Sequence, residues 1–202
     1  LARPITRGAR SMPKATGSRP FPVADIEKPA PVQLIAGTIR NPAVDGAAVK
    51  AVLEDAWGPI GTESPDWPFD FTDYYKAEMG EGLLRKFFVW RDLRELEGLH
   101  RLKLESNEIE KRIAADSSAG AARTVNIDPG YICHSKLVLF TTKDFAHRIY
   151  IADGIFAEVT LEWRDGGFRA HPWTFPDYRT EKYIAFLNDV RSAYAKKLKR
   201  RP

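Results

Sequence analysis

The chain has 202 residues, of which 44% are hydrophobic and only Cys133 is a cysteine, which suits one domain with a full apolar core and excludes an internal disulfide framework. No apolar run reaches the length that a secretory signal or a membrane span requires, so we expect a soluble, cytoplasmic protein. The net charge of +4 comes from the two ends, because residues 29–195 carry a net charge of −5; this argues against nucleic-acid binding by the folded body and leaves only weak contacts through the basic ends.

The ends of the chain differ in composition from its centre. Residues 1–30 contain five prolines, six basic side chains and a single aromatic residue, Phe21. Such a segment cannot bury enough apolar surface to offset the entropy lost on ordering it. We therefore predict a disordered basic tail over residues 1–30, a single α+β domain over residues 31–196 and a basic C-terminal tail over residues 197–202.

The first half of the predicted domain alternates strand and helix patterns. Residues 32–39 read as a strand, and Asp45 precedes a helix that ends near Gly58. A second strand starts at Pro59. The alternating apolar side chains of residues 83–90 predict a third strand, apolar enough to lie in the middle of a sheet.

A long helix and a fourth strand complete this order. Residues 92–115 carry an apolar stripe at helical spacing, with an interruption at Gly98. Residues 123–128 form a short strand that an Asp128-Pro129-Gly130 turn closes. The order is β-α-β-β-α-β. We therefore predict an α+β fold with a ferredoxin-like βαββαβ core, in which a mainly antiparallel sheet carries both early helices on one face.

The remaining residues extend this core by a strand, a β-hairpin and a helix, predicted over residues 132–140, 145–163 and 180–196. A three-residue hairpin loop, Ala152-Asp153-Gly154, keeps the apolar side chains on one face, whereas a two-residue Asp153-Gly154 turn mixes polar and apolar faces. We therefore predict the three-residue loop. The cross-strand pairs are then Ile151 with Ile155, Ile149 with Ala157, His147 with Val159, Phe145 with Leu161, Tyr150 with Phe156 and Arg148 with Glu158.

Eight short phrases of the sequence occur together in one known family. They are PFDFTDYY at residues 68–75, EMG at 78–80, NIDPGY at 126–131, KLVL at 136–139, TKD at 142–144, HRIY at 147–150, AEVTL at 157–161 and WTFPDY at 173–178. Over roughly residues 31–196 the chain resembles DUF4416, a bacterial family of domains of unknown function. The resemblance implies no activity and assigns no catalytic residue, and residues before Pro31 lie outside it.

Polar and ionisable residues within apolar stretches are the candidates for a functional site. Carboxylates that a fold brings together need a cation, a basic partner or a raised pKa. We take five as candidate catalytic groups: Asp70, Glu78, Glu110, Asp128 and Glu158. As candidate ligand-binding groups we take Thr72, Tyr75, Lys103, Asn107, Asn126, Lys136 and Arg148. Together they predict a site for a phosphorylated or nucleotide-like small molecule, with Mg²⁺ as the cofactor that such carboxylates accept.

Each of these groups also has an ordinary structural interpretation. Asp70 and its neighbours fit a solvated loop, and Lys103, Asn107 and Glu110 fit exposed pairing along a helix. His147 fits a core histidine whose ring nitrogens have partners. Cys133 and His134 are adjacent in a strand and point to opposite faces, so they cannot act as a nucleophile and base.

No known catalytic motif is present, so the sequence leaves an enzyme and a binding module both open. In the second case the chain is a non-catalytic module for RNA or protein that uses aromatic side chains of a ferredoxin-like sheet. The candidates for stacking are Phe71, Tyr74, Tyr75, Phe88, Trp90, Tyr131 and Tyr150. An exposed aromatic sheet face favours the module, whereas a pocket with converging carboxylates favours the small-molecule site.

Overall fold

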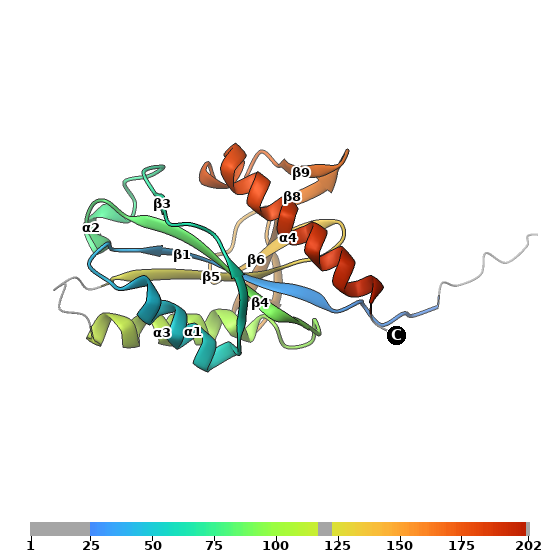
Figure 1. Ribbon diagram of the computed structural model, residues 1–202, viewed down its shortest axis with the longest axis horizontal. Coiled ribbons are helices and arrows are strands. Elements are labelled where there is room, and N and C mark those ends of the chain that lie inside the picture. The colour runs from blue at the N-terminus through green and yellow to red at the C-terminus, as the bar shows by residue number, and fades with distance from the viewer. Residues whose placement is uncertain (1–24, 117–122, 201–202) are drawn as a thin grey trace, which may run out of the picture.

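The computed structural model describes residues 25–116 and 123–200, and most of the predicted N-terminal tail lies outside them. Within the described residues, nine antiparallel strands form one sheet and four α-helices pack on it (Figure 1). The elements are β1 (Val32–Arg40), α1 (Gly46–Trp57), β2 (Ile60–Glu63), β3 (Trp67–Pro68), α2 (Lys76–Met79), β4 (Leu84–Arg94), α3 (Arg101–Asp116), β5 (Val125–Ile132), β6 (Lys136–Thr141), β7 (Ile149–Ala152), β8 (Ile155–Arg164), β9 (Gly167–Ala170), the 3₁₀-helix η1 (Asp177–Arg179) and α4 (Glu181–Lys199). This is a mixed α/β protein with an antiparallel sheet.

The strands follow the order β2-β4-β1-β5-β6-β8-β7, with β3 beside β4 and β9 beside β8. All nine residues of β1 are buried, including the polar residues Gln33, Thr38 and Arg40, as expected of a central strand that is covered on both faces. The expected strands at residues 32–39, 83–90 and 123–128 do lie in one antiparallel sheet, as β1, β4 and β5.

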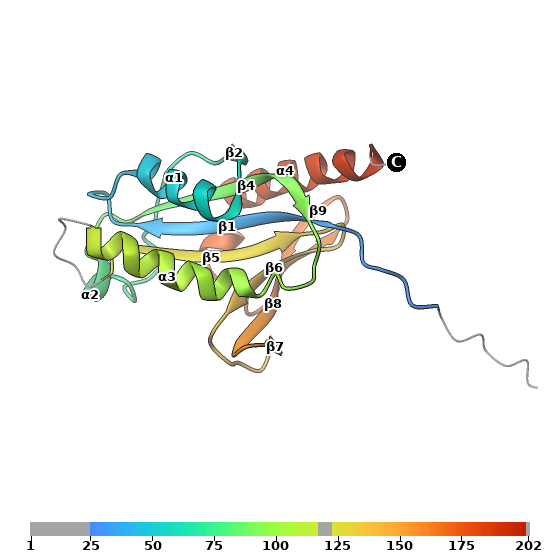
Figure 2. The same ribbon diagram turned by 90° about the horizontal axis from the view of Figure 1, so that it is seen from below.

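Both early helices cover the same face of this sheet, as predicted (Figure 2). The Asp45 side chain accepts a hydrogen bond from the Ala47 N–H and caps α1. From α1, Leu53 and Trp57 join one apolar cluster with Ile109 of α3. The two helices and the sheet therefore share a single core on this side.

The last helix covers the opposite face. Tyr183, Leu187 and Val190 of α4 pack against Phe87 and Val89 of β4, so the β1–β4–β5 part of the sheet lies between two helical layers (Figure 1). The helix runs to Lys199, three residues beyond its predicted end. The predicted C-terminal tail over residues 197–202 is therefore helical in its first half.

The predicted long helix over residues 92–115 is wrong in its first third. β4 continues to Arg94, where it pairs with Val32 of β1. The chain then turns through Gly98, whose φ of 77° favours glycine, and α3 begins only at Arg101. Three of the four residues 91–94 are charged, which resembles a helix in composition, but they lie at an exposed strand end.

The predicted turn at Asp128-Pro129-Gly130 is also absent. β5 runs through these residues to Ile132 and pairs with β1 along its whole length. The absence of a side chain at Gly130 allows β6 to approach β5 closely, because a Cβ at this position would lie 2.1 Å from the carbonyl oxygen of Val138 in β6. The predicted strand over residues 132–140 is correspondingly shorter and begins at Lys136.

The hairpin has the predicted register but a different turn. Ile149 pairs with Ala157 and Tyr150 with Phe156, as expected, but Ala152 pairs with Ile155 across a two-residue Asp153-Gly154 turn. Ile151 forms a bulge that absorbs the extra residue, so the predicted three-residue loop and Ile151–Ile155 pair are wrong. The strand begins at Ile149, so the pairs predicted for Phe145 and His147 do not form.

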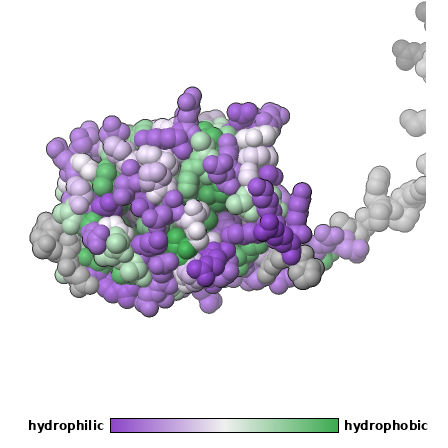
Figure 3. Space-filling view, in the orientation of Figure 1, coloured by the Kyte–Doolittle hydropathy of each residue, from purple (hydrophilic) through white to green (hydrophobic). Residues whose placement is uncertain are grey.

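Hydrophilic residues cover most of the face seen in Figure 1, with hydrophobic residues in small patches between them (Figure 3). Within residues 25–116 and 123–200, no helix is both long enough and apolar enough to cross a membrane.

Candidate functional site

The candidate site lies at the point where β6 diverges from its neighbour β5 and the two strands stop pairing. The two strands pair only at Gly130, Tyr131 and Ile132 of β5, so residues 125–128 have no strand beside them on that side. A cavity of about 650 Å³ occupies this position. Its walls come from α3, β5, the end of β6 and three loops around residues 69–78, 142–148 and 175–178.

Two side chains of α3 replace the missing strand at Ile127. The Ile127 N–H donates to Glu110 Oε1 at 2.7 Å, and the Lys103 ammonium donates to the Ile127 carbonyl at 2.7 Å. Both side chains are about nine-tenths buried. An unpaired strand edge inside a protein needs such partners, so these two residues have a structural role at the wall of the cavity.

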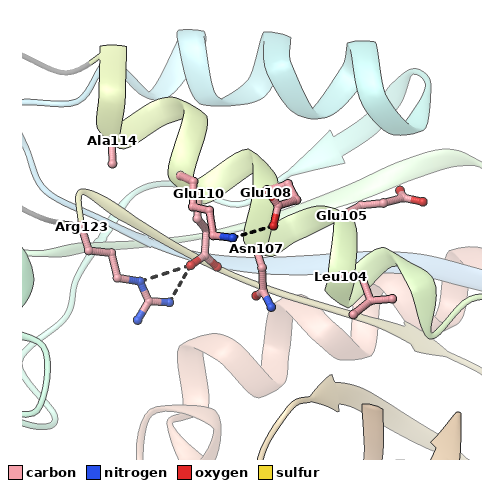
Figure 4. A pocket seen from close by; sticks show the side chains of 8 residues that line it. Leu104, Glu105, Asn107, Glu108, Glu110, Ala114 and Arg123 are labelled. Atoms are coloured by element: carbon pink, nitrogen blue, oxygen red, sulfur yellow. Dashed lines mark hydrogen bonds and ion pairs between the residues drawn. The ribbon is translucent and has the colours of Figure 1, made fainter. Parts of the chain in front are cut away.

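A chain of polar contacts continues from Glu110 to Asp128. Arg123 Nη2 donates to Glu110 Oε2 at 2.7 Å, a contact visible in Figure 4, and also to Asn126 Oδ1. The Asn126 amide in turn donates to Asp128 Oδ2 at 2.6 Å. Glu78 lies on the other side of Arg123, 3.7 Å from its Nη1. Glu78, Glu110 and Asp128 thus converge on shared basic and amide partners.

Arg85 forms the inner end of the cavity. Its Nη2 donates to Asp177 Oδ2 at 2.7 Å, and its guanidinium lies within 6 Å of the ring centres of Phe69, Phe87 and Tyr178. Nε and Nη1 are buried and have no hydrogen-bond partner among the described residues. Only 4% of the side chain is exposed, so Arg85 is a buried cation with donors to spare.

Glu158 of β8 anchors a second buried pair. Arg148 Nε donates to Glu158 Oε2 at 2.7 Å, and His147 Nε2 lies 3.4 Å from the same oxygen. Thr160 Oγ1 donates to Glu158 Oε1 at 3.2 Å. The side chains of Arg148 and Glu158 are only 6% and 2% exposed. The side chains of Arg148 and Glu158 are therefore in contact as expected, although Arg148 precedes β7 and the predicted cross-strand pair of the two residues does not form. The contact is buried rather than open to solvent.

Aromatic side chains surround the mouth of the cavity. Tyr74, Phe145 and Phe175 line it and are between 43% and 59% exposed. Lys143 lies beside this rim, with its ammonium 3.1 Å from the Tyr74 hydroxyl. Arg148 covers one face of Phe145 at 4.7 Å. The cavity therefore combines a charged interior with an aromatic, partly exposed mouth.

Residues 30–194 match the protein family described as Domain of unknown function (DUF4416). The chain belongs to DUF4416. A search of curated proteins and a search of solved structures each found no match. The whole cavity of this DUF4416 domain lies inside the matched region, which confirms the family resemblance of the sequence and adds no activity to it.

Burial changes the acid–base properties of several groups in the DUF4416 cavity. It raises the pKa of Glu110 against the opposing pull of Lys103 and Arg123. It also raises the pKa of Tyr75, with Asp128 as the next contributor, and the pKa of Tyr178. Both phenols, neutral at physiological pH like any tyrosine, are thus held still further from ionisation and can donate hydrogen bonds.

Most of the predicted site residues meet in this one cavity. Nine of them line it, namely Thr72, Tyr75, Glu78, Lys103, Asn107, Asn126, Asp128, Arg148 and Glu158. Glu110 contacts the lining residues Lys103 and Arg123 from behind. Asp70 and Lys136 do not line the cavity: Asp70 is exposed, and Lys136 pairs with Glu162 at the far end of β6.

Among the lining residues that the sequence did not single out are Arg123, Asp177 and Tyr178. Asp177 and Tyr178 belong to the WTFPDY phrase, so the family resemblance held a signal for them. Arg123 follows residues 117–122 directly, and nothing in its local sequence marks it. Arg85 did carry a signal, since it is a charged residue in the middle of a central apolar strand.

The carboxylates of the DUF4416 domain pair with basic groups rather than with one another. Among residues 25–116 and 123–200, no group of three or more His, Cys, Asp or Glu side chains is arranged to hold a metal ion. Instead Glu110 and Asp128 face Lys103, and Asp177 faces Arg85. These carboxylates therefore have basic partners, and Glu110 has a raised pKa as well.

A second hollow of about 590 Å³ runs along the outer side of α3, next to the cavity (Figure 4). Leu104 and the exposed ion pair between Glu108 and Lys111 lie along it. It shares the lining residues Asn107 and Arg123 with the cavity, so the two hollows adjoin.

Proposed function

We propose that the cavity of this DUF4416 domain binds a phosphorylated or nucleotide-like small molecule. The observation that carries the proposal is the buried guanidinium of Arg85, whose Nε and Nη1 have no hydrogen-bond partner among the described residues. Five basic side chains line the cavity against four acidic ones, whereas residues 29–195 as a whole carry a net charge of −5. At the inner end the unpaired Nε and Nη1 of Arg85 are suited to an oxyanion, which guanidinium groups bind strongly when desolvated.

The aromatic mouth supports the nucleotide-like part of the proposal. Tyr74, Phe145 and Phe175 place exposed rings beside the charged interior. Rings in this position stack on a planar base or pack on the face of a sugar while the phosphate lies deeper. The proposal includes no metal ion, because Glu110, Asp128 and Glu158 each already face a lysine or an arginine.

A thermal-shift screen of the full chain tests the proposal with nucleotides, sugar phosphates and Mg²⁺ as separate additions. A ligand at 100 times its Kd stabilises the folded state by about 2.7 kcal/mol. Phe145→Ala removes an exposed ring that lines the cavity, and Ile149→Ala removes an exposed side chain that does not. We expect Phe145→Ala to reduce the ligand-induced shift and Ile149→Ala to preserve it.

Both substitutions are at exposed positions, so neither should change the melting temperature of the free protein by much. No shift with any phosphorylated compound, or an equal loss in both variants, would show that the cavity is not the binding site.

The edge strand β7 favours a second candidate function, a non-catalytic module that binds a protein or an RNA. Ile149, Tyr150 and Ile151 are between 47% and 71% exposed on the last strand of the sheet, and an uncharged open edge can pair with another chain. By contrast, Phe88 and Trp90, two of the expected stacking residues, are buried in the core. A partner held by β7 would be lost in Ile149→Ala and kept in Phe145→Ala, the reverse of the small-molecule result.

We also propose that a ferredoxin-like unit carries the cavity. The order β2-β4-β1-β5, with α1 between β1 and β2 and α3 between β4 and β5, supports this assignment. In this view β6 to β9 and α4 are additions to the unit, and the cavity lies at the junction between β5 and the first added strand.

A further inference from the structure

Among the carboxylates in the interior of the cavity, Asp128 has the most exposed side chain and is the one that a ligand can reach. Its side chain is 28% exposed, whereas those of Glu110, Glu158 and Asp177 are 10%, 2% and 3% exposed. It accepts one hydrogen bond, from Asn126 at its Oδ2. An ionised carboxylate accepts about four hydrogen bonds, so Asp128 retains acceptor capacity on the side that faces the cavity.

Lys103 supplies donors next to this acceptor. Its ammonium uses one hydrogen bond on the Ile127 carbonyl and lies 3.5 Å from Asp128 Oδ1 and 3.9 Å from Glu110 Oε1. These two separations are those of ion pairs without a normal hydrogen bond. A spare donor and a spare acceptor therefore lie side by side at the wall of the cavity.

Such a pair selects a neutral group that both donates and accepts. A phosphate here would face the negative charge of Asp128, and an ammonium group would face the positive charge of Lys103. An alcohol hydroxyl donates to the carboxylate and accepts from the ammonium at the same time.

We propose that Lys103 and Asp128 together recognise a sugar hydroxyl, so that the ligand of the cavity is a phosphorylated sugar, either free or as part of a ribonucleotide. The inference rests on the proposed function and narrows its ligand class. Asp128 is then the residue that determines specificity for the hydroxylated ligand, and Asn126 positions its carboxylate.

Isothermal titration of the full chain tests this inference with four probes: adenosine 5′-monophosphate, its 2′-deoxy and 3′-deoxy analogues, and ribose 5-phosphate. A site built to bind a hydroxyl rejects the analogue that lacks it, because its polar groups are left unpaired. We expect at least one deoxy analogue to bind about tenfold or more weakly than the ribonucleotide. The relative affinities of ribose 5-phosphate and the ribonucleotide then distinguish a free sugar phosphate from a nucleotide.

In Asp128→Ala this discrimination should fall to less than about threefold, since the acceptor is gone. Asp128→Asn keeps the size of the side chain and provides the same comparison if the alanine variant unfolds. Asp70→Ala is the matched control, because it removes the same charge from an exposed position that does not line the cavity; it should keep the full discrimination.

Two results would overturn the inference while leaving the proposed function in place. One is equal affinity of the wild-type protein for the ribonucleotide and both deoxy analogues, which would mean that Lys103 and Asp128 bind a water molecule and no ligand hydroxyl. The other is undiminished discrimination in both Asp128 variants. If no phosphorylated probe binds the wild-type protein, the proposed function itself fails, and the hydroxyl inference falls with it.

Discussion

Replacing Glu158 by alanine should destabilise the protein strongly, because it leaves the Arg148 guanidinium buried without a counter-charge. The two side chains are 2% and 6% exposed and meet at 2.7 Å. Breaking a buried ion pair by removing one partner costs about 3–5 kcal/mol, against at most about 1 kcal/mol for an exposed pair. For a domain of this size the expected fall in melting temperature is roughly 6–20 °C.

Glu162→Ala is the matched control on the same strand. Glu162 pairs with Arg164 at 2.9 Å, and the two side chains are 35% and 63% exposed, so the loss should stay below about 1 kcal/mol. Urea unfolding of both variants measures the difference. An equally small loss in both variants would refute the reasoning, because it would mean that the Arg148–Glu158 pair is solvated and its position at the cavity has no energetic consequence.

Three further predictions concern the wall of the cavity and the core. Burial raises the folded-state pKa of Glu110 above its ordinary value of 4.5, so the contribution of this group to stability is fully present below pH 4.5 and is lost as the pH rises through the raised pKa. The stability advantage of the wild-type protein over Glu110→Gln, measured by urea unfolding, should therefore shrink as the pH rises from 4 to 7. An advantage that grows with pH would contradict the raised pKa. Gly130→Ala places a Cβ 2.1 Å from the Val138 carbonyl oxygen and should cost about 1–3 kcal/mol or more; an unchanged midpoint would show that β6 can move away. Asp45→Ala removes the cap of α1 and should cost about 1 kcal/mol in the same assay, whereas no loss would mean that solvent replaces the cap.

Local sequence signals predicted β1 and α1. β1 is rich in Val, Leu and Ile and is buried along its whole length, and α1 is marked by Asp45 and a regular apolar stripe. The charged end of β4 gave no such signal. Arg94 lies in a strand only because Val32 of β1 pairs with it, and such a tertiary contact overrides local propensity. Gly130 was misread for a similar reason, since the strand that requires a glycine there lies eight residues away.

The candidate site was predictable to the extent that polar residues stand out against apolar surroundings. Asn126 and Asp128 break a buried strand, and Lys103 lies beside the apolar stripe of α3, so both signals are local. The partner of Arg85 is Asp177, 92 positions further along the chain. Pairing at that separation depends on the packing of η1 against the sheet, which no local pattern encodes.

The most direct test of the central claim is an NMR titration of the full chain with adenosine 5′-monophosphate, followed through the backbone amide signals. If the cavity binds phosphorylated small molecules, the signals of lining residues such as Thr72, Asn126 and Thr142 should move in a saturable way, while those of Ile149 and Tyr150 on β7 stay in place. Shifts confined to β7, or no saturable shift at any residue with this nucleotide or with ribose 5-phosphate, would contradict the claim.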